Sequence, residues 1–241
     1  MPSTESAAAK SFARTLGLSS ALLSLDRAYH DPPRPEEQIA VEALRGAAAV
    51  LMVAAFENFL RDCTLEHLGR LQPPGKVKLS HFPEPIVLQS VFASMNSAIR
   101  GAPSRSQRAR LPDVRLAAHR IATETIDPLA FADTGSNPNS AQVRAMFKPF
   151  GEIDVYLSIK SRFDKEWKIA TPSTFIPDKL DEIVRRRHVV AHTANALNIT
   201  RSELRDSVRF LKLLARLLDS ELRRRVKSSL RVAIKTALSS S

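Results

Sequence analysis

The most reactive stretch of the chain is the run Arg185-Arg186-Arg187-His188-Val189-Val190-Ala191-His192. Histidine titrates near neutral pH, so His192 could take a proton from a ribose hydroxyl or return one to a leaving oxygen. Arginine keeps its charge and offers a planar fork that matches the oxygens of a phosphoryl group, so Arg187 could stabilise charge developing there. The pair therefore predicts chemistry on a phosphate, with Arg187 and His192 as the candidate catalytic residues.

The spacing of this pair sets a condition on the backbone. On a continuous α-helix, Arg187 and His192 would lie about 140° apart. Both reach one phosphate only if the helix ends or kinks between them, or if a second copy of the chain completes the site. In the alternative interpretation, His192 caps the helix C-terminus and the arginines are solvated.

The same run also contains a histidine pair with the spacing of a metal half-site. His188 and His192 are four residues apart and would share a helix face. However, Val189 stands where zinc proteases have a glutamate, and three adjacent guanidiniums repel a cation. We therefore expect neither a metal ion nor another cofactor.

Composition predicts an all-α fold to position these residues. Aromatic residues make up 6% of the 241 residues and only seven are glycine, which favours helices over a sheet. Apolar spacing and helix-end signals predict helices over residues 7–29, 35–71, 86–99, 141–148 and 177–192, with others starting at Pro112 and after Thr200. Residues 153–159 fit either a short strand or a helical turn.

We expect a single domain over residues 1–241 with three distinguishable parts. Residues 1–34 form an N-terminal helix and linker, residues 100–111 a basic loop, and residues 226–241 a basic tail. Net charge is +11 overall and is concentrated in residues 100–120 and 201–241. This distribution favours a polyanionic partner, although a solvated surface would have the same appearance.

Other protein classes are excluded by simple counts. The single cysteine, Cys63, cannot close an intramolecular disulfide, which excludes a disulfide-stabilised secreted scaffold. The longest apolar run, residues 47–56, is half of what a membrane span needs, so we expect a core helix and no membrane association. The first residues lack the pattern of a signal peptide, and we expect a cytoplasmic protein.

Four ordered segments together resemble the HEPN superfamily of helical ribonucleases. The run from Arg187 to His192 is similar to its Arg-x4-His motif. Residues 54–62, Ala-Ala-Phe-Glu-Asn-Phe-Leu-Arg-Asp, resemble the early helix of the prokaryotic RiboL-PSP and MAE-type branches. Residues 136–151 resemble their Asn-Pro segment, short helix and glycine, and residues 180–184 and 199–200 fit the flanks of the motif.

The resemblance implies a metal-independent endoribonuclease on an up-down helical bundle with an inserted, partly irregular middle segment. His192 would act as general acid or base, giving a 2′,3′-cyclic phosphate, and Arg187 would stabilise the transferred phosphorus. RNA, a second copy of the chain and an antitoxin protein are the implied partners, in a toxin–antitoxin or defence role.

Two other functions stay open. The superfamily most often has Asn where this chain has His188, so a catalytically silent HEPN module that binds RNA or a protein is one alternative. A helical nucleic-acid-binding protein that works through its basic C-terminal helix is the other.

Supporting roles are expected for residues around the pair. Glu57 lies on an apolar helix, so its carboxylate needs a partner. It would orient Arg187 or a motif histidine, unless it pairs with Arg61 or is exposed. His188 would line the cleft or the dimer interface, and Arg185 and Arg186 would contact RNA phosphates.

Overall fold

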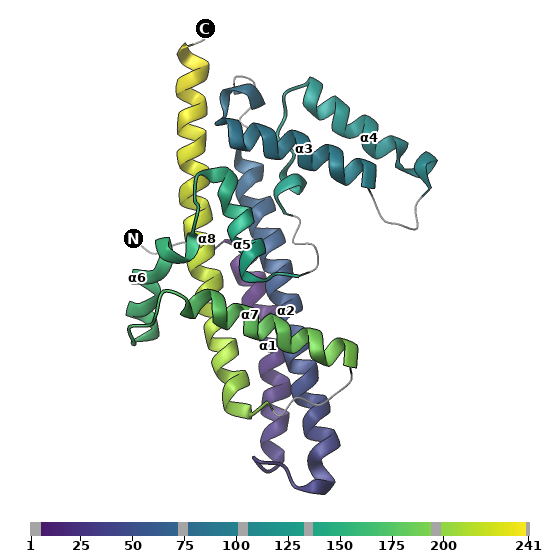
Figure 1. Ribbon diagram of the computed structural model, residues 1–241, viewed down its shortest axis with the longest axis vertical. Helices are drawn as coiled ribbons and strands as arrows, with labels where there is room; N and C mark the ends of the chain where they lie inside the picture. Colours follow the sequence, from purple (N-terminus) through teal and green to yellow (C-terminus); the bar gives the residue numbers. More distant parts are fainter. Residues whose placement is uncertain (1–5, 72–76, 101–105, 133–136, 194–198, 240–241) are drawn as a thin grey trace. The chain divides into compact units, whose positions relative to one another are not determined.

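The computed structural model describes residues 6–71, 77–100, 106–132, 137–193 and 199–239 (Figure 1). Every regular element in these ranges is helical, which confirms the all-α prediction. The α-helices are α1 (Ala7–Leu25), α2 (Gln38–Leu68), α3 (Glu84–Arg100), α4 (Gln107–Ala122), α5 (Ser140–Phe147), α6 (Val155–Trp167), α7 (Phe175–Thr193) and α8 (Arg201–Ser239).

Backbone contacts divide the chain into two compact units. The first contains Met1–Cys63, Thr134–Val143 and Val155–Asp219, and the second contains Thr64–Asp133, Arg144–Asp154 and Ser220–Ser241. The two longest helices, α2 and α8, each contribute one part to each unit. All residues of the Arg-x4-His run belong to the first unit.

The core of the first unit forms around α1 and α2. Ser6 caps α1, since its side chain accepts a hydrogen bond from the Ala9 amide at 3.0 Å. From Phe12 onward, α1 buries a residue every three or four positions, so one face is apolar. The Phe12 ring centroid lies 5.2 Å from that of Phe59 and 6.3 Å from that of Phe56 on α2.

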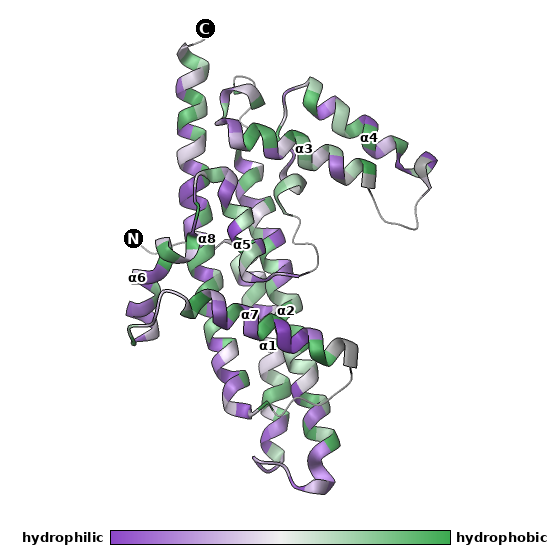
Figure 2. Cartoon of the chain, viewed as in Figure 1, coloured by the Kyte–Doolittle hydropathy of each residue, from purple (hydrophilic) through white to green (hydrophobic). Residues whose placement is uncertain are grey.

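Helix α2 carries hydrophobic residues along much of its length, interrupted by hydrophilic ones (Figure 2). With its flanking 3-10 turns, residues 35–71, it is long and apolar enough by length and composition to cross a membrane, a test that buried core helices also pass. Phe56 and Met52 are 0% and 1% exposed, and a charged residue, Arg45, is 6% exposed. In this structure α2 therefore serves as the core helix on which the other elements of the first unit pack.

Helix α8 begins with the expected capping box. The Thr200 amide donates to Glu203 Oε2 at 2.8 Å, and the Glu203 amide donates to Thr200 Oγ1 at 3.2 Å. Further along, Phe210 packs against Trp167 and Phe163 of α6 and Phe175 of α7. These contacts hold α6, α7 and the first half of α8 together.

The second unit is organised by the pair of helices α3 and α4. Asp127, 7% exposed, accepts a hydrogen bond from Ser94 of α3 at 3.1 Å and pairs with Arg120 of α4 at 2.7 Å. Gly151 follows α5 and a 3-10 turn in the left-handed conformation, with φ 74°, where glycine is favoured. It ends this segment as expected.

Three expected boundaries were wrong. Helix α4 starts at Gln107 rather than Pro112, because the Ser106 side chain caps it by accepting from the Ala109 amide at 3.2 Å. The basic loop expected over residues 100–111 is therefore helical at residues 107–111 and at residue 100, and residues 101–105 lie outside the described ones. Residues 226–239 continue α8 instead of forming a tail.

For residues 153–159, where a strand and a helical turn were both left open, the structure has helix from residue 155 onward.

Candidate functional site

Arg187 continues the buried stripe of helix α7. The preceding members of this stripe, Ile176, Leu180 and Ile183, are at most 3% exposed and recur every three or four residues. Arg187 is the next residue in this series, where an apolar side chain would be expected. A guanidinium in this position needs a counter-charge, because burying an unpaired charge is costly.

Glu57 of α2 supplies that counter-charge. Its Oε2 lies 3.9 Å from Nη2 of Arg187, with the two side chains 25% and 23% exposed. Arg187, a motif histidine, Arg61 or solvent were the surroundings expected for Glu57, and the structure brings it to Arg187. At this distance the pair is looser than a bidentate arginine–carboxylate contact, so it orients the guanidinium without enclosing it.

Helix α7 comes close to α2 at a glycine. A Cβ added to Gly46 would lie 3.1 Å from Cγ1 of Val190, which is one turn beyond Arg187. Gly46 and Glu57 are 11 residues apart, about three helical turns, so they lie on the same face of α2. The close approach at one position and the ion pair at the other fix the position of α7 on this face.

Other residues of the arginine- and histidine-rich run lie on a different side of α7. Arg185 and His188 are exposed. Helix α7 continues to Thr193, so it does not end between Arg187 and His192. By helix periodicity the backbone of residue 192 falls on the stripe of Arg185 and His188. The side chain of His192 lies outside the described residues.

Arg186 has a different environment from its neighbours. Its Nη2 pairs with Glu182 one turn earlier and with Glu203 of α8, the latter at 2.9 Å, and its side chain is 16% exposed. Hydrogen bonds from Thr200, together with Arg186, hold the pKa of Glu203 below its usual value. Arg186 therefore joins α7 to the capping box of α8, and its expected contact with RNA stays a prediction.

A buried ion-pair network, which sequence reasoning missed, fixes the start of α8. Asp26, 0% exposed, pairs with Arg45 at 3.2 Å and with Arg201 at 2.6 Å. Arg45 also donates to the carbonyl oxygen of Ile199 at 2.9 Å. Arg45 interrupts the apolar pattern of α2, and that interruption was the one signal in the sequence.

The Asn-Pro segment is attached to the same helix as the motif. Asp181 of α7 accepts hydrogen bonds from the amide and the hydroxyl of Ser140, both at 2.7 Å. The carbonyl oxygen of Ser140 accepts a hydrogen bond from Tyr156, which is 1% exposed, at 3.2 Å. The start of α5 is thereby bound to the N-terminal half of α7.

The comparison with protein families gives a match over most of the chain. The model of the RiboL-PSP-HEPN family matches residues 18–224. The chain belongs to this HEPN family. No curated protein and no solved structure gives a match.

Membership of the HEPN family agrees with the all-helical architecture and with an RNase or RNA-binding role. Two features around Arg187 could bind a phosphate group. One is the permanently charged guanidinium of Arg187 beside the Glu57 carboxylate, and the other is the exposed stripe of α7 that contains Arg185 and His188.

Proposed function

We propose that this HEPN protein is a metal-independent endoribonuclease. The observation that supports the proposal most directly is the pairing of Arg187 with Glu57 on the interface between α7 and α2, five residues before His192. Placing a charge in an otherwise apolar stripe costs desolvation free energy, which a part-exposed ion pair recovers only in part, so a function of the guanidinium best explains this placement.

In the proposed reaction, the 2′-hydroxyl oxygen of a ribose attacks the adjacent phosphorus, and the bond to the 5′-oxygen breaks. His192 takes the hydroxyl proton or delivers one to the 5′-oxygen, which leaves as an alcohol. Arg187 binds the phosphoryl oxygens more tightly as their charge grows. The products are a 2′,3′-cyclic phosphate and a 5′-hydroxyl end, and the reaction needs no metal ion.

The first test compares wild-type protein with His192→Ala on a labelled single-stranded RNA in EDTA. We expect cleavage with cyclic phosphate ends by the wild type, loss of cleavage by His192→Ala, and affinity for RNA unchanged within about twofold. His119→Ala is a matched control, because His119 is an exposed histidine on α4. Equal cleavage by His192→Ala, or cleavage only with added metal, would contradict the proposal.

A composite site in a homodimer is the second part of the proposal. Because α7 is continuous from Arg187 to residue 192, the two positions start from different sides of the helix. A second copy would allow Arg187 of one chain to act with His192 of the other, as an isologous interface repeats every contact twice. His188 would then lie beside the cleft.

Mixing inactive variants tests this arrangement. After exchange between Arg187→Ala and His192→Ala at equal amounts, about half the dimers are mixed, and each has one intact composite site of two. We expect recovery of about a quarter of wild-type cleavage. No recovery, although the subunits exchange, would place both residues of each site in one chain.

A silent HEPN module that binds RNA is the second candidate function. The same continuity of α7 favours it, since one chain alone does not bring the two positions to a common side. It predicts that neither protein cleaves RNA with or without divalent metal, while Arg185→Ala weakens RNA binding. The toxin, defence, antitoxin and cytoplasmic assignments remain predictions from the sequence.

A further inference from the structure

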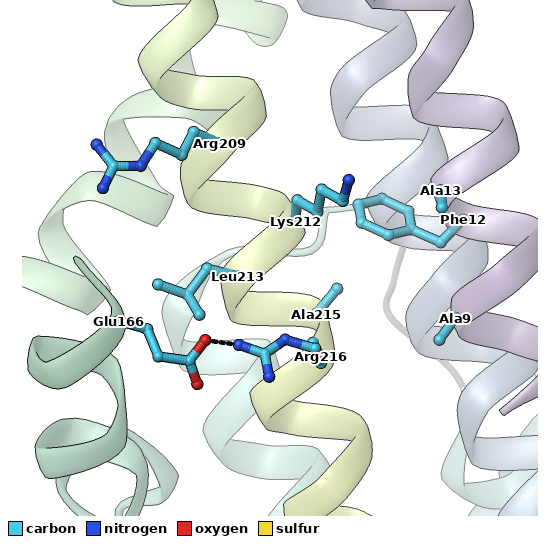
Figure 3. A pocket seen from close by; sticks show the side chains of 9 residues that line it. All are labelled: Ala9, Phe12, Ala13, Glu166, Arg209, Lys212, Leu213, Ala215 and Arg216. Atoms are coloured by element: carbon cyan, nitrogen blue, oxygen red, sulfur yellow. Dashed lines mark ion pairs between the residues drawn. The ribbon is translucent and has the colours of Figure 1, made fainter. Parts of the chain in front are cut away.

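The first unit contains a groove to which helix α7 contributes no residue. It has a volume of about 330 Å³ and lies between α1, α6 and α8 (Figure 3). Its apolar floor includes Phe12 with Ala9 and Ala13 of α1, and its charged side consists of Arg209, Lys212 and Arg216 of α8. The groove is therefore separate in composition from the Arg187 site.

The groove exists because the side chains of α1 beside α8 are small, and the packed ring of Phe12 lies beneath it. Ala9 and Ala13 are one turn apart on α1, so no long side chain fills the space beside α8. Phe12 is 4% exposed and packs on Phe56 and Phe59, which makes it a fixed part of the floor. A ligand would meet chiefly the methyl groups of Ala9 and Ala13, which are more exposed than the Phe12 ring beneath them.

The cations of the groove are spaced along α8. Arg209, Lys212 and Arg216 are three and four residues apart, so their backbones span about 10 Å of the helix. Arg205, also exposed, lies one turn before Arg209. Three cations against one carboxylate give the lining a net positive charge, which attracts a polyanion.

Each cation is held differently. Arg216 pairs with Glu166 of α6, the one carboxylate in the lining. The guanidinium carbon of Arg209 lies 4.3 Å from the centroid of the Trp167 ring, and its Nη2 donates to the Trp167 carbonyl oxygen at 3.2 Å. Lys212 is exposed and has no hydrogen bond or ion pair within the described part of the chain. It extends toward Phe12, whereas Arg209 extends to the other side of α8 (Figure 3).

We propose that this groove is a second RNA-binding surface, which holds the backbone of a single strand away from the Arg-x4-His motif. A positively charged groove that tracks the backbone is one part of the arrangement by which proteins bind single strands without sequence preference. The proposal rests on the proposed function only in taking RNA as the ligand. An acidic protein segment would be attracted by the same charges, and competition with an oligoglutamate peptide distinguishes this ligand from RNA.

The experiment measures binding of a labelled 2′-O-methyl RNA oligonucleotide to the full chain by fluorescence anisotropy at several salt concentrations. The 2′-O-methyl groups remove the nucleophile, so binding is read without cleavage. We expect Lys212→Glu to weaken binding about tenfold and to lower the salt dependence of log Kd by about one unit. Lys235→Glu makes the same change on an exposed part of α8 in the second unit, and we expect less than about a twofold effect.

A neutral variant separates the groove from net charge. Ala13→Gln leaves the charge unchanged and places a longer side chain, compatible with a helix, in the groove. We expect it to weaken RNA binding about fivefold, since it occupies the space of the ligand. Circular dichroism checks that Lys212→Glu, Lys235→Glu and Ala13→Gln keep the helical content of the wild type.

Three results would overturn the proposal: unchanged binding by Lys212→Glu, equal weakening by Lys235→Glu, or displacement of RNA by an oligoglutamate peptide at the same concentration as unlabelled RNA. Its failure is distinguishable from failure of the nuclease. If cleavage depends on His192 but RNA binding is unaffected by Lys212→Glu, only the groove proposal is contradicted. If Lys212→Glu weakens RNA binding but cleavage does not depend on His192, only the nuclease proposal is contradicted.

Discussion

The ion pair between Glu57 and Arg187 should contribute measurably to stability through its coupling. The perturbation is a double-mutant cycle with Glu57→Gln, Arg187→Met and the double variant. At 3.9 Å, two unit charges interact by about 1 kcal/mol in bulk water and about 4 kcal/mol at an effective dielectric constant of 20. Because each side chain is roughly a quarter exposed, we expect a coupling free energy near the lower limit, about 1–2 kcal/mol.

The assay is urea unfolding of the four proteins, followed by circular dichroism at low and high salt. Coupling should decrease at high salt, because exposed charges are screened more than buried ones. The pair Glu66–Arg70 is a matched control, since Glu66 also lies on α2, is 22% exposed and has its partner at 2.9 Å four residues later, in the 3-10 turn that follows the helix. We expect about 0.3–0.5 kcal/mol for it.

The reasoning would be refuted by a coupling at Glu57–Arg187 no larger than that of the control pair. Arg187 would then be oriented by something other than this carboxylate. If the coupling is large but Glu57→Gln cleaves RNA as fast as the wild type, the ion pair is confirmed. Its proposed role in orienting Arg187 for catalysis is then contradicted.

Three further predictions concern the frame around the site. Asp26→Asn should lower the free energy of unfolding by about 3 kcal/mol, since it removes the buried carboxylate that Arg45 and Arg201 share and leaves Arg45 with Asp31 alone; a change below about 1 kcal/mol in urea unfolding would contradict this. The lowered pKa of Glu203 should stabilise the fold fully above pH about 4.5, and this contribution should be lost as pH falls through the lower folded-state pKa; NMR titration of the Glu203 carboxyl tests this against Glu203→Gln. Gly46→Ala should lower stability by about 1 kcal/mol, because overpacking against Val190 exceeds the gain in helix propensity, and Val190→Ala should restore it.

The sequence predicted those features that depend on local patterns. The capping box of Thr200 and Glu203 formed as expected, because its partners are three residues apart. The start of α4 at Pro112 was wrong for a related reason: Ser106 offers an earlier cap, and the chain tolerates the proline within the helix. Helix ends are therefore predictable only when one capping signal has no competitor nearby.

For residues whose partners are distant in the chain, the sequence predicted that a partner was required but not which residue it is. The sequence showed that Glu57 required a counter-charge, and Arg187, 130 residues further along the chain, was one of several candidates. Asp26 and Arg201 are 175 residues apart, and nothing in their neighbourhoods indicated each other. Which oppositely charged groups meet depends on the packing of α1, α2 and α8, and that packing is not encoded in any single segment.

The three successive arginines of α7 show how helix geometry assigns different tasks to identical side chains. Arg185 is exposed, Arg186 is bound to carboxylates of α7 and α8, and Arg187 lies in the stripe that faces α2. Neighbouring positions on a helix are separated by about 100°, so each guanidinium meets a different environment. Arg187 alone combines partial burial, which strengthens its interaction with a phosphate, with a loosely placed carboxylate that keeps it oriented. For this reason we propose the phosphate-binding role for Arg187 rather than for the run as a whole.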